Sequence, residues 1–467
     1  MKINDKLTGT VERIDEKGRG ILKVPRSGIP QSVTGTKEAL AYFVIPGETI
    51  NATVRARKEG ALRLRVDGIP SPSADRVVPR CPYAGRCGGC PWQMIDYPRQ
   101  CQLKMELVNR AFEESGDQSL ESRTIAQDSR LRIQDSNFVP AKSIFYHRNR
   151  MDYVFGAGGE LGLKEPERWA GVLDLSTCYM MSEEAVKIMH VVREYVKRTG
   201  ITPWDNRRHT GFARYLVIRE GKNSGKRLVM FTTSAEHDTL PDEASLAESL
   251  KPLCTTLLHG INPDITDLSI PKTVRTVFGE PTLIEQVGDL TYTIPPAAFF
   301  QTNTEMSEVI RDTVVEFAAP CAGETVMDLY CGVGFLSLAL AKDAEQVIGI
   351  ELDESAIEAA RTNAVMNHIP NVTFSAGATE ALLPTTLMRD KPSIVVVDPP
   401  RVGLHPKALT ALMAYGAKRL IYVSCNPRSL ARDLTELLKI YTPVQSRCID
   451  LFPHTPHIET VVALERS

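Results

Sequence analysis

The sequence has no run of about 18 consecutive apolar residues, so we expect no transmembrane helix. The opening residues, MKINDKLTGTVERID, lack the apolar core of a secretory signal peptide. Internal repeats and low-complexity tracts are also absent, so a repeat architecture is not expected. These absences predict a cytoplasmic protein with no membrane partner, and its 467 residues suffice for about three domains.

The chain also has little net charge, but the small total of −2 hides an asymmetry. Residues 1–68 carry 13 Lys and Arg against 8 Asp and Glu, a net charge of +5, which leaves −7 for the remainder. A basic module on an acidic body favours a nucleic-acid partner, although a solvated basic surface would have the same composition.

Three composition patterns follow one another and predict a multidomain α/β protein. Residues 1–68 alternate in short strands, with a hairpin at Glu59-Gly60, as in a small β-barrel of the oligonucleotide-binding type. Residues 69–295 mix a cysteine-rich loop, helices and strands, which indicates a central α+β domain. Residues 296–467 alternate apolar strands with helices, which predicts a Rossmann-like, doubly wound sheet that binds ligands at the carboxyl ends of its strands.

A glycine turn follows the first strand of that last region, in the stretch DLYCGVGFLSL at 328–338. Gly332 and Gly334 let the backbone approach a ligand, and Glu351 ends the next strand, where it can accept hydrogen bonds from ribose hydroxyls. A nicotinamide fingerprint needs a third glycine where Ser337 stands. The shortened motif therefore favours S-adenosylmethionine.

Two later strands also end in reactive side chains. VVVDPPR delivers Asp398, and IYVSCNPRSL delivers Cys425 immediately before Asn-Pro, which ends the strand because proline has no N–H to donate. Asp398 is either a ligand-binding carboxylate or a cap at the strand end. Cys425 is either a nucleophile or a buried small apolar residue.

Two further stretches have open interpretations. CPYAGRCGGC places Cys81, Cys87 and Cys90 on a glycine-rich loop, where either an iron–sulfur cluster or zinc would suit the three thiolates. FYHRNRMDYVFG, at 145–156, interleaves arginines with aromatics, and is either an RNA contact or a strand with a polar face.

The motifs DPPR, SCNPRSLARDL, FPHTPHIETV and FFQTN together closely resemble the RNA uracil-5 methyltransferase family, over essentially the whole chain. The resemblance implies that S-adenosylmethionine is bound by four residues: Gln301, Tyr330, Phe335 and Glu351. It also implies that Asp398 holds the uracil, Cys425 is the nucleophile and Glu459 is the base that removes the carbon-5 proton. Family members often carry Asn or Thr where Phe335 stands, which puts the side-chain contact at that position in question.

The reaction implied by this resemblance needs a thiolate. Carbon 5 of uracil becomes reactive toward a methyl sulfonium only after a thiolate has added to carbon 6. We therefore expect the neighbours of Cys425 to activate it partly, since the thiolate is the reactive form.

The resemblance further implies a [4Fe–4S] cluster, with Cys178 as the distant fourth ligand beside Cys81, Cys87 and Cys90. The N-terminal barrel resembles the TRAM domain, and together with the cysteine loop it favours 23S rRNA as the substrate. Three alternatives stay open: the T-loop uridine of tRNA, RNA cytosine-5 methylation, and a non-catalytic RNA-binding protein. The cytosine enzymes usually carry a second cysteine after the Asp-x-Pro segment, and VVDPPRVG has none. We expect a monomer.

Overall fold

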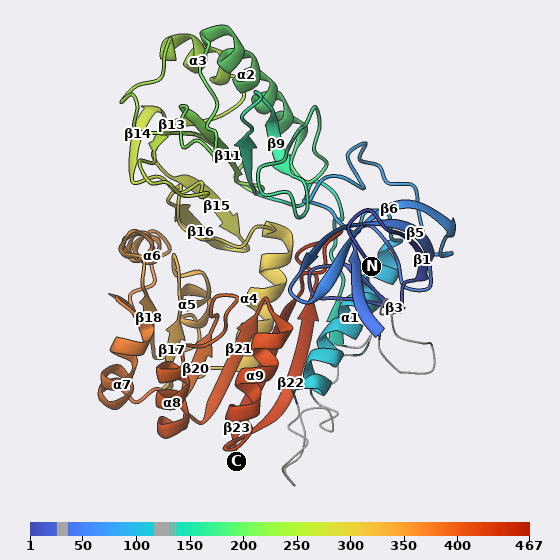
Figure 1. Ribbon diagram of the computed structural model, residues 1–467. Helices are drawn as coiled ribbons and strands as arrows, with labels where there is room; N and C mark the ends of the chain where they lie inside the picture. Colours follow the sequence, from blue (N-terminus) through green and yellow to red (C-terminus); the bar gives the residue numbers. More distant parts are fainter. Residues whose placement is uncertain (26–35, 116–130, 132–133, 135–136) are drawn as a thin grey trace. The chain divides into compact units, whose positions relative to one another are not determined.

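The computed structural model describes residues 1–25, 36–115, 131, 134 and 137–467, and these form two compact units (Figure 1). The first unit comprises Met1–Leu107, Lys164–Trp169 and Phe452–His457. The second comprises Val108–Leu163, Ala170–Leu451 and Ile458–Ser467. No helix within the described ranges is long and apolar enough to cross a membrane.

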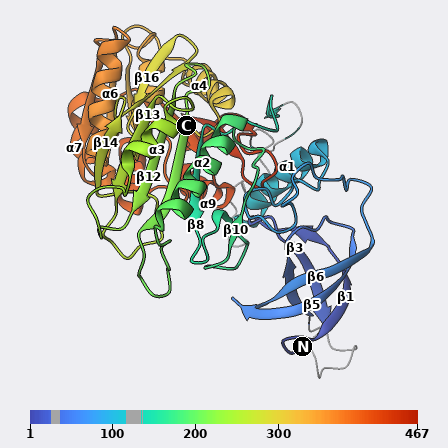
Figure 2. The same ribbon diagram turned by 90° about the horizontal axis from the view of Figure 1, so that it is seen from above.

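The first unit is built on a six-stranded sheet in the order β1-β5-β6-β4-β3-β2 (Figure 2). Its strands are β1 (Lys6–Thr10), β2 (Arg13–Ile14), β3 (Gly20–Pro25), β4 (Thr36–Ala41), β5 (Thr49–Lys58) and β6 (Ala61–Ser71). The predicted hairpin joins β5 to β6, because Glu59 and Gly60 both have positive φ, at 53° and 77°, as a two-residue turn between twisted strands requires. β6 continues to Ser71, which pairs with Thr49, beyond the boundary expected at residue 68.

This sheet curls back on itself just after β1. The Val11 amide donates to the Glu48 carbonyl at 2.9 Å, and the next amide, of Glu12, donates to Ile21 of β3 at 2.8 Å. The chain thus changes partners within two residues, and the apolar side chains of β3, β5 and β6 enclose one core. This change of partners is compatible with a small barrel, and the barrel over residues 1–68 stays a prediction.

A second core in the same unit lies beneath the cysteine-rich loop. Trp92 is fully buried and packs with Ile14, Ile45 and Leu103, the last from α1 (Tyr97–Glu114). The Trp92 amide donates to the His454 carbonyl at 2.9 Å, which holds the segment Phe452–His457 in this unit.

The second unit contains a seven-stranded sheet in the order β10-β9-β8-β11-β12-β13-β14. Its strands are β8 (Arg150–Phe155), β9 (Leu161–Lys164), β10 (Val172–Asp174), β11 (Ala213–Glu220), β12 (Arg227–Thr233), β13 (Thr256–Ile261) and β14 (Thr273–Phe278). The helices α2 (Glu183–Thr199) and α3 (Glu243–Leu250) contact each other, and α2 also packs against β11. A separate hairpin, β15 (Leu283–Val287) and β16 (Leu290–Ile294), follows in the chain.

The same unit contains an eight-stranded sheet in the order β19-β18-β17-β20-β21-β23-β22-β7 (Figure 1). Its strands are β7 (Phe138–Val139), β17 (Thr325–Leu329), β18 (Gln346–Glu351), β19 (Val372–Ala376), β20 (Ile394–Val397), β21 (Arg419–Ser424), β22 (Tyr441–Ile449) and β23 (Glu459–Arg466). The strands from β19 to β21 are parallel, and β23 lies antiparallel between β21 and β22.

Helices cover both faces of this sheet, as the alternating pattern predicts. One layer holds α4 (Thr304–Ala318), α5 (Phe335–Leu340) and α6 (Glu354–Met366), and the other holds α7 (Thr379–Asp390), α8 (Pro406–Tyr415) and α9 (Pro427–Leu437). The chain reverses its direction of travel across the sheet between β17 and β20, so the crevice for a ligand is expected at the carboxyl ends of these two strands.

Candidate functional site

A small cavity lies at the carboxyl end of β17. Its lining includes Gln301, Asp328, Tyr330, Phe335 and Asp398, so the structure brings together residues that are far apart in the sequence. Four of these were expected to bind cofactor or substrate.

The backbone that forms the floor of this cavity is tightly turned. Tyr330 has φ of 65°, which is uncommon for a side chain of its size, and its amide donates to the Ile350 carbonyl at 2.8 Å. Gly334 has φ of 83°, and a Cβ there would lie 3.1 Å from the ring of Phe374. The positive φ therefore favours glycine at this position, and any side chain there would also require the Phe374 ring to shift.

Phe335, where the family resemblance left the side-chain contact in question, is buried against aromatic rings. Its ring centroid lies 5.4 Å from that of Phe300 and 5.7 Å from that of Tyr292. These contacts give the cavity an apolar wall where a polar Asn or Thr would offer a hydrogen bond.

Glu351 lies at the end of β18 and faces the glycine turn. The Gly332 amide donates to its Oε2 at 3.1 Å, and the Leu352 amide donates to its Oε1 at 2.6 Å. The carboxylate is half-buried, so it stays open to a ligand that presents hydroxyl groups.

Asp328 contributes a buried carboxyl, which the sequence placed at a strand end beside the ligand crevice without assigning it a role. It has no exposed surface; Ser337 donates to its Oδ2 at 2.5 Å, while Oδ1 has no hydrogen-bond partner among the described residues. Burial raises the pKa of Asp328 to about 7, with a smaller contribution from Glu351. The available signal in the sequence was its position near the carboxyl end of a buried strand.

Asp398 faces Asp328 across the cavity. The Gln301 side-chain amide donates to its Oδ2 at 3.5 Å. Burial, and then repulsion from Asp328, raise the pKa of Asp398 to about 7. Two carboxyls held in this way make the cavity suitable for a cationic ligand, because a positive charge would stabilise both ionised forms.

The register of β21 and β23 brings Cys425 and Glu459 together. Ser424 pairs with Thr460 in this antiparallel ladder, so the next residue of β21 and the preceding residue of β23 stand opposite each other. Cys425 is half-buried and Glu459 is only 4% exposed. Asp398 directly follows β20, the parallel neighbour of β21, so it lies at the same edge.

The chain turns sharply after Cys425 because Asn426 caps the following helix. Its Oδ1 accepts the Arg428 amide at 3.1 Å, and its Nδ2 donates to the Arg401 carbonyl at 2.8 Å. Pro427 then begins α9, a position at which its missing N–H has no cost. The strand thus delivers its thiol at the point where the ladder ends.

The expectation that neighbours activate Cys425 is wrong for the free protein. Burial, followed by the charges of Glu459 and Asp398, raises the pKa of Cys425 to about 12, while Arg401 lowers it. Burial and Asp398 likewise raise the pKa of Glu459 well above its usual range, against a lowering by Arg401. The sequence pattern placed these groups at one edge but did not reveal that acids outnumber cations there.

The cysteine-rich loop belongs to the first unit, and Cys178 belongs to the second. The loop is turn-rich, with the Cys87 amide donating to the Tyr83 carbonyl at 2.9 Å. In the part of the chain that the structure describes, no group of three or more His, Cys, Asp or Glu side chains is arranged to hold a metal ion. The geometry therefore gives the predicted cluster no support.

The stretch 145–156 contains β8, so it forms a strand, which was one of the two structures predicted for it. Arg150 forms a two-pronged ion pair with Asp152, at 2.8 and 3.0 Å, so that guanidinium already has a carboxylate partner. Asn149, directly before Arg150, was not singled out from the sequence. It makes the contacts that reach the wall of the cavity.

Comparisons with known proteins agree with the motifs. A family model described as tRNA (uracil-5-)-methyltransferase matches residues 278–467. An uncharacterized RNA methyltransferase of Nanoarchaeum equitans is 33% identical over 463 residues, covering 98% of this chain and 92% of the relative. Another, of Caldanaerobacter subterraneus subsp. tengcongensis, is 33% identical over 469 residues and covers 99% of each chain.

One solved structure is similar over nearly the whole length. It is the Pyrococcus abyssi tRNA (uracil-54, C5)-methyltransferase in complex with S-adenosyl-L-homocysteine, with a TM-score of 0.76 and 27% sequence identity. The match covers 98% of this chain and 99% of that chain.

Proposed function

This chain belongs to the RNA uracil-5 methyltransferase family, and from that premise we propose that it methylates carbon 5 of a uridine in folded RNA through a covalent adduct on Cys425. S-adenosylmethionine supplies the methyl group as a sulfonium. The observation that carries the proposal is the pairing of β21 with β23, which puts Cys425 opposite Glu459 and beside the Asp328–Asp398 cavity.

In the proposed reaction, Cys425 adds as a thiolate to carbon 6 of the uracil ring, and the electron pair moves to carbon 5. Carbon 5 forms its new bond to the methyl carbon while the methyl–sulfur bond breaks and the electron pair leaves with sulfur. Glu459, as a carboxylate, then removes the carbon-5 proton. The carbon 6–sulfur bond breaks, which restores the aromatic ring and the Cys425 thiolate.

Both groups must lose a proton before they act, because their pKa values are raised in the free protein. A cationic ligand in the adjacent cavity would favour the ionised forms, as would Arg401. The unpartnered Oδ1 of Asp328 fits such a ligand, since no described group satisfies it otherwise. Occupancy of the cavity would therefore switch the thiol and the base into their reactive states.

The remaining roles follow the same proposal. Asp398 holds the uracil, and four residues hold the methyl donor: Gln301, Tyr330, Phe335 and Glu351. The basic barrel at the N-terminus binds structured RNA, and the target uridine leaves its stack to reach Cys425.

We propose 23S rRNA as the substrate, on the resemblance of the barrel to a TRAM domain and on the cysteine loop. The second candidate is uridine 54 of tRNA, favoured by the Pyrococcus abyssi enzyme, whose chain is matched over 99% of its length. Nucleoside mass spectrometry on separated 23S rRNA and tRNA, from a parent strain and a strain lacking this gene, distinguishes them. Loss of 5-methyluridine from 23S rRNA alone supports the first; loss from tRNA alone overturns it in favour of the second.

An iron–sulfur cluster held by Cys81, Cys87, Cys90 and Cys178 is a proposal from the sequence alone. Protein purified without oxygen should be brown, with a visible thiolate-to-iron absorbance band and about four irons per chain. A colourless preparation with one zinc per chain would contradict the cluster and leave the methyl transfer proposal intact.

A further inference from the structure

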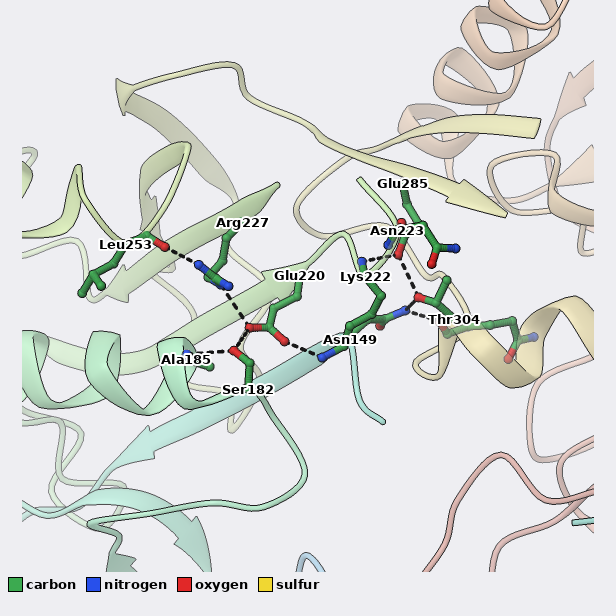
Figure 3. A network of polar contacts seen from close by, with 11 residues as sticks. Asn149, Ser182, Ala185, Glu220, Lys222, Asn223, Arg227, Leu253, Glu285 and Thr304 are labelled. Atoms are coloured by element: carbon green, nitrogen blue, oxygen red, sulfur yellow. Dashed lines mark hydrogen bonds and ion pairs between the residues drawn. The ribbon is translucent and has the colours of Figure 1, made fainter. Parts of the chain in front are cut away.

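Gln301 owes its place in the cavity to the short segment 301–304, which enters α4. The segment lies outside the strands, so its position depends on hydrogen bonds from neighbouring residues. Asn149, directly before β8, supplies three of them, one from its backbone amide and two from its side-chain amide, and Figure 3 shows the one to Thr304. Its backbone amide donates to the Thr302 carbonyl at 2.8 Å, and its side-chain amide donates to the Gln301 carbonyl at 2.8 Å and to Thr304 Oγ1 at 2.9 Å.

Asn149 is itself held by the central sheet. It is 7% exposed, and its carbonyl accepts the backbone amide of Glu220, the last residue of β11, at 2.8 Å. Its side-chain nitrogen donates both of its hydrogens to segment 301–304. A residue of the central sheet therefore fixes the backbone of a residue that lines the cavity.

A buried carboxylate sets the direction of these hydrogen bonds. Glu285, on β15, has no exposed surface, and its Oε2 accepts the Thr304 hydroxyl at 2.8 Å. It also accepts three backbone amides, those of Lys222 at 2.7 Å, Asn223 at 3.1 Å and Gln286 at 2.9 Å. Because the Thr304 hydroxyl donates its only hydrogen to Glu285, that oxygen must accept from Asn149.

From this chain of contacts we infer that Asn149, backed by Thr304 and Glu285, is a positioning residue that holds Gln301 against the methyl-donor cavity. The inference rests on the proposed function, since it assumes that the cavity binds S-adenosylmethionine. It assigns to the stretch 145–156 a part in cofactor binding, which differs from the RNA contact that its arginines suggested.

The geometry demands an amide at position 149. An aspartate has the same shape, but its oxygens cannot donate to the Gln301 carbonyl and would repel it. Asn149→Asp thus preserves packing while reversing the polarity of the contact. Thr304→Val removes only the relay between Asn149 and Glu285, and the bond to the Gln301 carbonyl remains.

The same figure offers a matched control. Ser182 caps α2 by accepting the Ala185 amide at 3.1 Å, and it donates to Glu220 (Figure 3). Within the described residues it makes no hydrogen bond to segment 301–304. Ser182→Ala should lower the melting temperature through the lost cap, without moving Gln301.

The experiment is isothermal calorimetry of S-adenosylmethionine and S-adenosylhomocysteine binding to the full-length variants, together with melting temperatures. We expect Asn149→Asp to weaken both ligands by about tenfold or more, Thr304→Val by a few-fold, and Ser182→Ala by less than about twofold. In turnover assays, Asn149→Asp should raise KM for the methyl donor more than it lowers kcat.

Two results would overturn the inference. One is wild-type affinity in a folded Asn149→Asp protein. The other is an equal loss of affinity in Ser182→Ala, which would mean that general destabilisation is responsible. If Asn149→Asp does not fold, Thr304→Val carries the test, with Thr304→Ser expected to restore affinity. Failure of the wild-type protein to bind either ligand would instead contradict the proposed function.

Discussion

Two sets of buried carboxyl groups in the second unit have opposite surroundings. Glu220, at the end of β11, and Glu285, on β15, each accept hydrogen bonds from several donors. Burial alone would raise the pKa of Glu220, but Lys222, Ser182 and Arg227 together lower it. At the strand ends, burial instead raises the pKa values of Asp328, Asp398 and Glu459, and repulsion adds to it, from Glu351 on Asp328, from Asp328 on Asp398 and from Asp398 on Glu459.

The difference distinguishes buried carboxylates that stabilise the fold from buried carboxylates that bind a ligand. A carboxylate removed from water is costly unless hydrogen bonds and cations replace the solvent. The first set meets that condition within the protein, so it can hold segments in place. The second set does not, so part of its stabilisation must come from a ligand, which is the usual signature of a binding site.

The largest expected effect concerns the thiol beside the second set. Cys425→Ala should reduce methylation of RNA by about 10⁴-fold or more and abolish any covalent RNA complex, because it removes the thiol that adds to carbon 6 in the proposed reaction. A tritium-transfer assay and a denaturing gel measure the two outcomes. Cys448→Ala is the control, since Cys448 is a buried thiol on β22 outside the cavity lining, and it should retain turnover. Normal turnover by Cys425→Ala would contradict the comparison.

Next in size is the loss of the base. Glu459→Gln should lower turnover by about 10²- to 10⁴-fold and let the protein–RNA adduct accumulate, because the carbon-5 proton is not removed. At a pH high enough to ionise Glu459, the same change removes a charge that raises the pKa of Cys425, so the free thiol should react faster with iodoacetamide. A slower alkylation rate would mean that Glu459 does not face the thiol.

Replacing one carboxyl by an amide in each of the two sets of buried carboxyl groups sharpens the comparison between them. Asp328→Asn should stabilise the cofactor-free protein at about pH 8, by up to about 4 kcal/mol, because the folded protein holds this carboxyl with a pKa of about 7 against 3.8 in the reference state. Folding at that pH forces an ionised group into an unfavourable site, and the penalty disappears as the pH falls through 7 toward 4. Urea unfolding at several pH values measures it.

Glu285→Gln should have the opposite effect on the free energy of unfolding, because it should destabilise the protein. Glu285 accepts four hydrogen bonds, and the amide nitrogen of glutamine would face one of these donors without being able to accept from it. The lost hydrogen bond costs about 2 to 3 kcal/mol at the same pH. If both substitutions destabilise the protein equally, the two sets do not differ in the proposed way.

The smallest expected effect is on the pH dependence of cofactor affinity. A cationic ligand favours ionised Asp328 and Asp398, so S-adenosylmethionine should bind with proton release and gain about tenfold in affinity as the pH rises through 7. Calorimetry in buffers with different ionisation enthalpies counts the protons. Asp328→Asn should flatten this dependence, and an affinity independent of pH in the wild-type protein would contradict it.

Much of the catalytic edge could be predicted from the sequence because it depends on local patterns. Alternating strands and helices indicated the doubly wound sheet, and the residues that end each strand had to meet at one edge. The pairing of β23 with β21 could not be predicted in this way, because it joins residues across a long separation and depends on β22 lying outside it.

The protonation states were also beyond the sequence. Whether Cys425 is activated depends on how many acids lie near it and on how deeply it is buried, and both emerge only when three chain segments fold together. Asn149 was missed for a similar reason: its partners in segment 301–304 lie more than 150 residues away, and asparagine before a strand has no pattern of its own.

The central claim is that Cys425 attacks uracil beside the under-partnered carboxyls. The most direct test uses RNA that contains 5-fluorouridine, because fluorine at carbon 5 cannot be removed as the proton is, so the adduct is trapped. The protein is incubated with this RNA and S-adenosylmethionine, digested, and mapped by mass spectrometry. We predict a methylated fluorouridine nucleotide on the peptide that contains Cys425. Methylation of ordinary RNA without any trapped adduct, or an adduct on another residue, would contradict the account.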